Sequence, residues 1–575
     1  MKRLKKISPI LLLMIFQMTA NHAQEFNWAV GVGQESVNEG RCIAMDSNND
    51  VVHAGIFWGS PDFDPGENEY RLTSAGDADI FIQKLDVNSN LIWAARMGGL
   101  NWEEVTAMAI DSDDNIYLTG IFSWKTNLST NNDTSANFES IGGGDIFIVK
   151  LNSKGDTEWF KVFPGLGDDF VSSIVLDDVN NPIIAGSFAK TMDFNSDPLE
   201  ENLATSKGAD DSFILKLSRS GNRLWFKTFG GTSGERVTAL AIDTANNIIA
   251  GGNFRGTVDF ADNDPGSTLT SAGFDDSFIL KIDTRANFIW VKHISSADGS
   301  TSIYALDTDS LGTIYTNTEF FTTLDLDKNG NAYVIEPNEE GYSDFALAHY
   351  MADGSFVWAK HFVNEFDYIE PHGLKISKNG EIFLAGQFSG TIDCDPGPGK
   401  SVLNASSDDT DIFLIKLSPA GSYIWSGQAG GLGEERCVAL SLGGENKILL
   451  SGLFQKPADL NPNLTQSFLM SPVAFYDAYA ILMTDQTITS SGINSKSRGL
   501  LVYPNPVGDF ATIQLPVKAL NLNGRIISME GTVLRSFQFS GGNSFQLDFR
   551  DFSPGIYFIH FDSEQAVAPM KVVKQ

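Results

Sequence analysis

The feature that most constrains this chain is a tryptophan that returns at an almost constant interval. The intervals are 65, 66, 66, 65, 68 and 67 residues, and the series comprises Trp28, Trp93, Trp159, Trp225, Trp290, Trp358 and Trp425. A period of tens of residues is typical of repeat architectures, in which each repeat is one supersecondary unit that packs against its neighbours. The sequence therefore predicts seven copies of one structural unit.

Each repeat predicts a meander of four antiparallel strands. Residues 210–231 hold two apolar segments joined by a polar turn, and residues 237–254 add the segments VTALAID and NIIAGGNF around a second turn. Clusters of Asp, Asn, Ser and Gly between short β-branched runs are hairpin signals, because these residues tolerate the dihedral angles of tight turns.

The apolar pattern and the two unmatched end strands predict how the units assemble. Both faces of the strand around Phe213 are apolar, so each sheet is expected to lie between two others, as in a ring of radially stacked sheets. The tryptophan strand at 26–32 has no apolar strand before it, and the apolar strand at 476–484 has no tryptophan strand after it. We therefore predict an all-β, seven-bladed β-propeller closed by the N-terminal strand. An open array of the same sheets is the alternative, but it leaves both end strands unpaired.

The repeat also resembles a known family. Segments such as DDSFILKLSRSGNRLW at 210–225 and DFDPG at 62–66 match the strand pair and acidic loop of the secreted bacterial seven-bladed β-propeller repeat family. The resemblance covers residues 24–486 and implies the fold without implying an activity. The fifth repeat departs from the pattern, with SLGTIYTNTEF and YSDFALAHY, which indicates either drift in a tolerant scaffold or a place where function was added.

The N-terminal segment and the composition predict export. Residues 1–23 combine the basic start MKRLKK with an apolar run and a small residue at Ala23, as in a secretory signal peptide. The apolar run is too short to cross a bilayer, and we expect no transmembrane anchor. The formal net charge of −32 disfavours nucleic acid as a partner and suits an extracellular surface. Three cysteines are too few for a disulfide framework, and we expect them to be buried free thiols.

The C-terminal 75 residues lack the tryptophan repeat of the preceding chain. After a segment at 487–500 that is rich in Ser, Thr and Gly and is expected to be a flexible linker, residues 501–575 predict a small β-sandwich. This part resembles the type A sorting domain of type IX secretion substrates in Gram-negative bacteria, through Tyr503, Pro504, Asn505, Pro506, Gly555, Tyr557, Lys571 and Lys574. The resemblance implies the type IX machinery as a partner and a secreted or cell-surface location; a generic β-sandwich is the alternative.

An acidic loop follows the second strand of most repeats, and the loop of the fifth repeat has the spacing of calcium ligands. There Asp325, Asp327, Asn329 and Glu336 place oxygen atoms at alternate positions with a late carboxylate. Ala332 and Pro337 depart from an EF-hand, and no flanking helices are expected. The alternative is that the aspartate caps a turn in every repeat. Calcium is the one cofactor that the sequence suggests.

Three tryptophans lie outside the repeat series: Trp58, Trp102 and Trp124. Trp58 and Trp124 both follow a GIF segment, so we expect them at matching places on adjacent blades. Exposed aromatic side chains suit sugar rings or peptide side chains, whereas packing over the blade edge is the structural alternative.

No catalytic constellation is visible in the sequence. The acidic residues before the first strand of several repeats are expected to be solvated loop charges: Glu103, Glu104, Asp168, Asp169, Glu235, Glu434 and Glu435. The seven histidines are isolated, and no HExxH, GxSxG or P-loop motif occurs. We predict an exported, non-catalytic propeller that binds a protein or glycan. A secreted carbohydrate-active enzyme with its site in the propeller channel is the alternative, and a purely structural surface component is a third hypothesis.

Overall fold

The computed structural model describes residues 22–574 with gaps at 34–36, 132, 197–199, 262–263, 265, 329, 339–341, 365–367, 408, 463–466, 473–474, 488–500, 504–509, 520–521, 529–532, 540–541, 554 and 562–569. The chain forms two compact units, the first of which ends at Thr487. The expected signal peptide, apart from its last two residues, and the expected linker from residue 488 lie outside the described residues.

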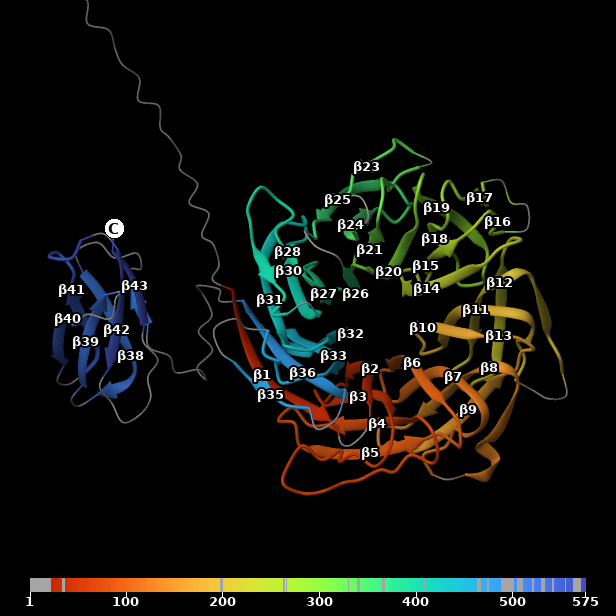
Figure 1. Ribbon diagram of the computed structural model, residues 1–575, viewed down its shortest axis with the longest axis horizontal. Coiled ribbons are helices and arrows are strands. Elements are labelled where there is room, and N and C mark those ends of the chain that lie inside the picture. The colour runs from red at the N-terminus through yellow and green to blue at the C-terminus, as the bar shows by residue number, and fades with distance from the viewer. Residues whose placement is uncertain are drawn as a thin grey trace, which may run out of the picture. The chain divides into compact units, whose positions relative to one another are not determined.

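The first unit is a ring of seven blades, each built on four antiparallel strands, which confirms the predicted β-propeller (Figure 1). The first strand of each blade lies at the centre of the ring. Blade 1 comprises β2 (Asn38–Met45), β3 (Val51–Phe57), β4 (Asp79–Leu85) and β5 (Leu91–Met97); blade 2 comprises β6 (Glu103–Ile110), β7 (Ile116–Asn127), β8 (Asn137–Leu151) and β9 (Thr157–Phe163); and blade 3 comprises β10 (Phe170–Leu176), β11 (Pro182–Asp193), β12 (Leu203–Leu217) and β13 (Arg223–Phe229). Blade 4 comprises β14 (Glu235–Ile242), β15 (Ile248–Phe254), β18 (Asp276–Ile282) and β19 (Phe288–Ser296), and blade 5 comprises β20 (Thr301–Thr308), β21 (Ile314–Phe320), β24 (Asp344–Tyr350) and β25 (Phe356–Phe362). Blade 6 comprises β26 (Ile369–Ile376), β27 (Ile382–Phe388), β30 (Asp411–Leu417) and β31 (Tyr423–Gly431), and blade 7 comprises β32 (Glu435–Gly443), β33 (Lys447–Phe454), β36 (Asp477–Thr487) and β1 (His22–Val32). In two blades the sheet continues into a short hairpin of the next blade's acidic loop: β22 (Leu324–Asp325) and β23 (Val334–Ile335) follow β19, and β34 (Ala458–Asp459) and β35 (Leu469–Met470) follow β31.

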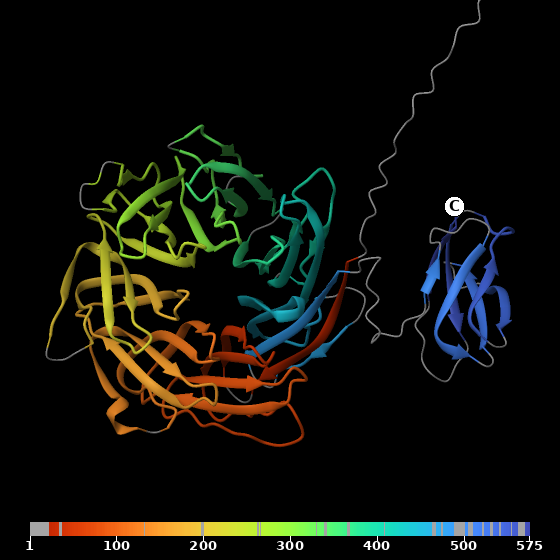
Figure 2. The same ribbon diagram turned by 180° about the vertical axis from the view of Figure 1, so that it is seen from behind.

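The N-terminal strand closes the ring, as predicted. β1 pairs antiparallel with β36, and Trp28 lies opposite Leu482. Both views show the red β1 beside the blue β36 (Figures 1 and 2). The pairing runs from His22 opposite Thr487, so this seventh blade includes two residues of the expected signal peptide and the first residue of the expected linker.

The repeated tryptophans join neighbouring blades. Four indole Nε1 atoms donate to a backbone carbonyl in the turn between the third and fourth strands of the next blade, at 3.0–3.3 Å: Trp28 to Val87, Trp93 to Ser153, Trp159 to Arg219 and Trp225 to Thr284. In that turn Gly155 has φ 86°, and a Cβ there would lie 3.0 Å from the Trp93 ring. Glycine at this turn position therefore serves the dihedral angle and the close approach together, whereas Ser89 and Ala286 hold the same left-handed position in blades 1 and 4.

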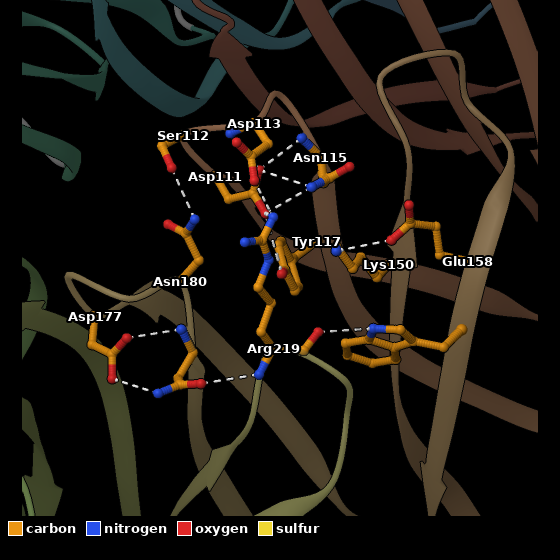
Figure 3. Close-up of polar contacts among 12 residues, drawn as sticks. Asp111, Ser112, Asp113, Asn115, Tyr117, Lys150, Glu158, Asp177, Asn180 and Arg219 are labelled. Carbon is orange, nitrogen blue, oxygen red and sulfur yellow. Dashed lines mark hydrogen bonds and ion pairs between the residues drawn. The ribbon is translucent and has the colours of Figure 1, made fainter.

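Charged and polar side chains reinforce the same seams. Between blades 2 and 3, Arg219 forms an ion pair with Asp113, and the Asn180 amide donates to the Ser112 hydroxyl at 2.9 Å (Figure 3). Between blades 6 and 7, the buried Lys416 ammonium lies 2.5 Å from the Asp485 carboxylate. Such buried pairs cost stability when one partner is lost, because the other charge stays desolvated.

Four of the acidic residues expected on solvated loops are instead fully buried, so that expectation was wrong for Glu103, Asp169, Glu235 and Glu435. Their carboxylates accept backbone N–H groups of Gly99, Ala189, Gly231 and Gly431 at 2.8–3.1 Å, because the loops between blades fold inward and need acceptors. Each lies near a buried aspartate of the preceding blade: Asp79, Asp145, Asp211 and Asp411. Burial raises the pKa of Glu103 and of Glu435 to about 8. Asp168 is exposed, as expected.

The three cysteines match the prediction. Cys42, Cys394 and Cys437 are buried free thiols, and burial raises the pKa of each to about 12.

The C-terminal unit is a small all-β domain with two sheets. One sheet has the order β37 (Leu501–Tyr503), β38 (Phe510–Ala519) and β41 (Gly542–Asp548); the other has the order β40 (Val533–Phe539), β39 (Leu522–Ser528), β42 (Gly555–Phe561) and β43 (Met570–Lys574). Ile513 of the first sheet and Ile526 and Ile559 of the second are buried. The domain is the β-sandwich that its alternating strands predict.

Candidate functional site

A groove of about 430 Å³ lies where the loops of the first three blades meet. We call it the tryptophan groove, and it is lined by Asp77, Asn101, Trp102, Ile121, Ser123, Trp124, Gly142, Gly143, Gly144, Asp168 and Phe170. Its volume falls within the roughly 300–1,000 Å³ range of small-ligand sites. Its lining includes Trp102 and Trp124, two of the three tryptophans that stand outside the repeat.

Trp124 is displayed from a strained turn in β7. Its side chain is 65% exposed, its φ is 63°, and the Ser140 hydroxyl accepts its backbone N–H at 2.8 Å. Glycine holds the corresponding left-handed position in blades 1, 4 and 6, at Gly59, Gly256 and Gly390, and Lys190 holds it in blade 3 with φ 58°. A residue with a Cβ costs roughly 1–2 kcal/mol in this conformation. The turn thus carries a large exposed ring at a position where glycine would be less strained.

Trp102 and Trp58 are placed differently. Trp102 is half-buried and packs against the core between blades 2 and 3. Trp58 is also half-buried, and its indole donates to the Asp77 carboxylate at 2.9 Å, so it reaches the groove only through Asp77. The expected match between Trp58 and Trp124 was wrong by one residue, because Gly59 is the residue of blade 1 that shares the left-handed conformation of Trp124.

Three consecutive glycines of β8 provide a groove wall without side chains. A Cβ at Gly142 would lie 2.6 Å from the backbone carbonyl oxygens of Gly165 and Gly167, so this position requires glycine. The backbone N–H of Gly143 donates to the Gly167 carbonyl at 2.8 Å. Sequence reasoning missed this wall, although the run GGG directly before a repeat strand was visible in the sequence.

The loop proposed for calcium forms a turn held by the chain itself. The Asp325 carboxylate accepts the backbone N–H groups of Asp327 and Tyr333 at 3.1 and 3.2 Å. Asp327 pairs with the Lys292 ammonium at 2.6 Å, and Glu336 accepts the Thr323 hydroxyl at 2.7 Å. The fourth suggested ligand, Asn329, lies outside the described residues.

The same capping bonds recur in the other blades. The first aspartate of each loop accepts the backbone N–H two residues later: Asp62, Asp193, Asp259, Asp393 and Asp459. Within the described part of the chain, no group of three or more His, Cys, Asp or Glu side chains is arranged to hold a metal ion. The recurring geometry supports the turn-capping role of these aspartates.

A second polar site lies on the central channel at blades 5 and 6. We call it the channel cluster; it comprises Tyr304, Glu319, Glu370, His372 and Gln387. The Tyr304 hydroxyl donates to Glu319 at 3.1 Å and lies 3.5 Å from Glu370. Glu370 also accepts from Gln387 at 2.6 Å and interacts with His372 at 3.0 Å. Tyr304 and His372 line the channel, a hollow of about 280 Å³.

The two carboxyl groups of the channel cluster differ in pKa. Burial raises the pKa of Glu319 to about 7. Burial also acts to raise the pKa of Glu370, but hydrogen bonds from His372 and Tyr368 outweigh it and lower the pKa. Near neutral pH the site therefore holds one partly protonated and one ionised carboxyl group.

The fold and its closure define the first unit as a seven-bladed β-propeller. The second unit defines how the protein leaves the cell: residues 501–575 match the family described as the secretion system C-terminal sorting domain. The protein is therefore a β-propeller exported by type IX secretion and located outside the cell or on the cell surface of a Gram-negative bacterium.

The sorting residues named from the sequence are only partly described. Tyr503 ends β37, Gly555 and Tyr557 lie in β42, and Lys571 and Lys574 lie in β43. The Tyr557 ring is buried, and its hydroxyl donates to the Ser553 carbonyl at 2.7 Å. Pro504, Asn505 and Pro506 lie outside the described residues.

Comparisons of the chain with curated proteins give distant similarity. An uncharacterized WD repeat-containing protein of Acanthamoeba polyphaga mimivirus is 20% identical over 79% of this chain, and the regulatory protein FlaEY of Caulobacter vibrioides is 26% identical over 69%. The matched regions span 33% and 41% of those proteins.

Solved structures resemble the chain only weakly. The extracellular domain of a putative one-component system from B. thetaiotaomicron has a TM-score of 0.17 at 10% identity, covering 96% of this chain and 99% of that one. The phage phi92 endosialidase has a TM-score of 0.31 at 9% identity, covering 96% and 88%. The strand pairing, rather than these similarities, establishes the propeller. Among the described residues, no helix has the length and hydropathy of a membrane span.

Proposed function

We propose that the protein is an exported, non-catalytic propeller of the secreted bacterial repeat kind, which binds a glycan or protein ligand through the tryptophan groove. The observation that carries the proposal is Trp124, a ring that is 65% exposed on a left-handed turn residue. Backbone strain that packing does not require is concentrated at functional sites in proteins. An exposed indole beside Trp102 also has the chemistry of a ligand platform.

Binding arrays test this proposal with the mature full-length chain. The wild-type protein is screened on glycan and protein arrays together with Trp124→Ala, and Phe274→Ala serves as the matched control because Phe274 is 67% exposed on a loop of blade 4. We expect Trp124→Ala to lose the ligands that wild type binds and Phe274→Ala to keep them. Ligands that survive Trp124→Ala would contradict the groove as the binding site.

The channel cluster favours a second candidate, a carbohydrate-active enzyme. Two carboxyl groups whose pKa values are pushed apart can act as general acid and base in glycoside hydrolysis. This candidate predicts that wild type hydrolyses an oligosaccharide and that Glu319→Gln abolishes hydrolysis without changing the melting temperature. The non-catalytic proposal predicts no hydrolysis by either protein, as measured by reducing-sugar release.

A further inference from the structure

We infer that the tryptophan groove recognises an uncharged oligosaccharide. The inference rests on the proposed binding function and names the class of ligand. It is based on three features of the groove. These are its exposed aromatic faces, its carboxylate oxygens that can accept hydrogen bonds, and a glycine wall whose backbone groups are already hydrogen-bonded and so cannot pair with a peptide strand.

The groove offers aromatic surfaces of the kind that stack on sugar rings. Trp102, Trp124 and Phe170 all line it, and Phe170 is 43% exposed. The face of an aromatic ring is electron-rich, and it attracts the slightly positive C–H groups on the flat side of a sugar. The Arg236 guanidinium lies 5.6 Å from the Phe170 ring and is paired with Asp210 at 2.9 Å, so that cation is already neutralised.

The polar groups of the groove are hydrogen-bond acceptors. Asp77 accepts one bond from Trp58 at Oδ1, and Asp168 accepts a long bond of 3.4 Å from Gly144 at Oδ1. From the described residues, neither carboxylate receives a hydrogen bond at its second oxygen, Oδ2, which is left for a ligand. Carboxylates accept hydrogen bonds from hydroxyl donors, and sugars supply neighbouring hydroxyl groups in fixed geometry.

Charge excludes acidic glycans. The described residues that line the groove include two aspartates and no Lys or Arg, and the chain carries a net charge of −32. Uronic, sialylated or sulfated sugars would therefore be repelled, since like-charge juxtaposition opposes association.

A cationic peptide is the rival that charge alone would allow, and the backbone argues against it. Peptides that bind along an extended wall do so by adding a strand to unpaired N–H and C=O groups. Here the Gly143 N–H is bonded to the Gly167 carbonyl, and the Gly144 carbonyl accepts the Asp169 N–H at 3.0 Å. The glycine wall is therefore closed to strand addition, and ligand contacts must come from rings and carboxylates.

Isothermal titration of the mature full-length chain tests the inference. The probes are four neutral hexasaccharides (cello-, xylo-, manno- and malto-), an oligogalacturonate, a heparin hexasaccharide and a Lys- and Trp-rich peptide. We expect at least one neutral hexasaccharide to bind, Trp124→Ala to weaken it about 10-fold or more, and Asp168→Asn to weaken it by a smaller factor. Phe274→Ala should leave the affinity unchanged, and the acidic sugars should not bind.

The outcomes separate this inference from the proposed function. Trp124-dependent binding of the peptide or of an acidic sugar, without binding of a neutral one, overturns the inference and leaves a ligand groove in place. If no probe binds and no array ligand depends on Trp124, both proposals fail. Binding of a neutral sugar that survives Trp124→Ala would place the sugar elsewhere and would also overturn the inference.

Discussion

The seams between blades and the tryptophan groove use the same side-chain types, tryptophan and acidic residues, for opposite purposes. In the seams, tryptophan rings and carboxylates are turned inward, as in Trp159 bonded to the next blade and Glu103 buried beside Asp79. In the groove, Trp124 and Asp168 are turned outward. The seam residues obey the repeat, whereas Trp124 breaks it. A residue that departs from the repeat without serving the ring is therefore the better guide to function.

The largest expected effect comes from breaking a seam at Lys416. Lys416→Ala leaves Asp485 buried and unpaired between blades 6 and 7, which should cost about 3–5 kcal/mol of unfolding free energy. The exposed pair Lys125 and Glu139 supplies the control, because Lys125→Ala should cost about 1 kcal/mol or less. Urea unfolding measures both. Equal losses would mean that seam pairs contribute no more than surface pairs.

The buried carboxyl pairs predict a pH dependence of stability. The pKa of Glu103 and of Glu435 is about 8 in the folded chain and about 4.5 when unfolded, so between these values the folded state binds more protons. Stability should therefore fall as pH rises from about 4.5 to about 8. The double variant Glu103→Gln, Glu435→Gln should flatten this slope and be more stable than wild type at pH 8 by at least about 1 kcal/mol. Melting curves at several pH values measure it, and an unchanged slope would refute the assignment.

Asp325 distinguishes a turn cap from a calcium ligand. Asp325→Ala removes the acceptor of two backbone N–H groups and should cost about 1 kcal/mol. The loss should be the same with calcium and with EDTA. A rise in melting temperature on adding calcium to wild type, absent in the variant, would instead support the metal site.

The smallest expected effect is a gain. Trp124→Gly removes the strain that a Cβ causes in the left-handed conformation, so it should raise the free energy of unfolding by up to about 1 kcal/mol while removing ligand binding. Loss of stability would mean that the indole is a packing residue, and it would remove the contrast between groove and seam.

The repeat made the fold predictable, because seven tryptophans at one interval and two unmatched end strands leave few arrangements. The calcium spacing was visible too, but spacing does not reveal that Asp325 caps backbone groups and that Asp327 pairs with Lys292. Whether a loop carboxylate is buried depends on how the loop folds inward. The burial of Glu103 therefore could not be predicted from the acidic residues next to it in the sequence.

The channel cluster was missed for a different reason. Tyr304 and His372 are 68 residues apart, which is one repeat, and they occupy equivalent positions of β20 and β26. In the sequence they look isolated, although the propeller fold brings the centroids of their two aromatic rings to 4.9 Å from each other. An alignment of the seven repeats by turn position would reveal such departures, and it would also correct the one-residue misplacement of Trp58.

The pairing of β1 with β36 gives the chain a built-in order of events. The earliest strand to be made finds its partner only when residues 477–487 exist, so every shorter chain keeps an unsatisfied strand edge. Such an edge is a site for wrong pairing with other chains. A polypeptide destined for export thereby postpones its final architecture until nearly all of the propeller sequence has been made.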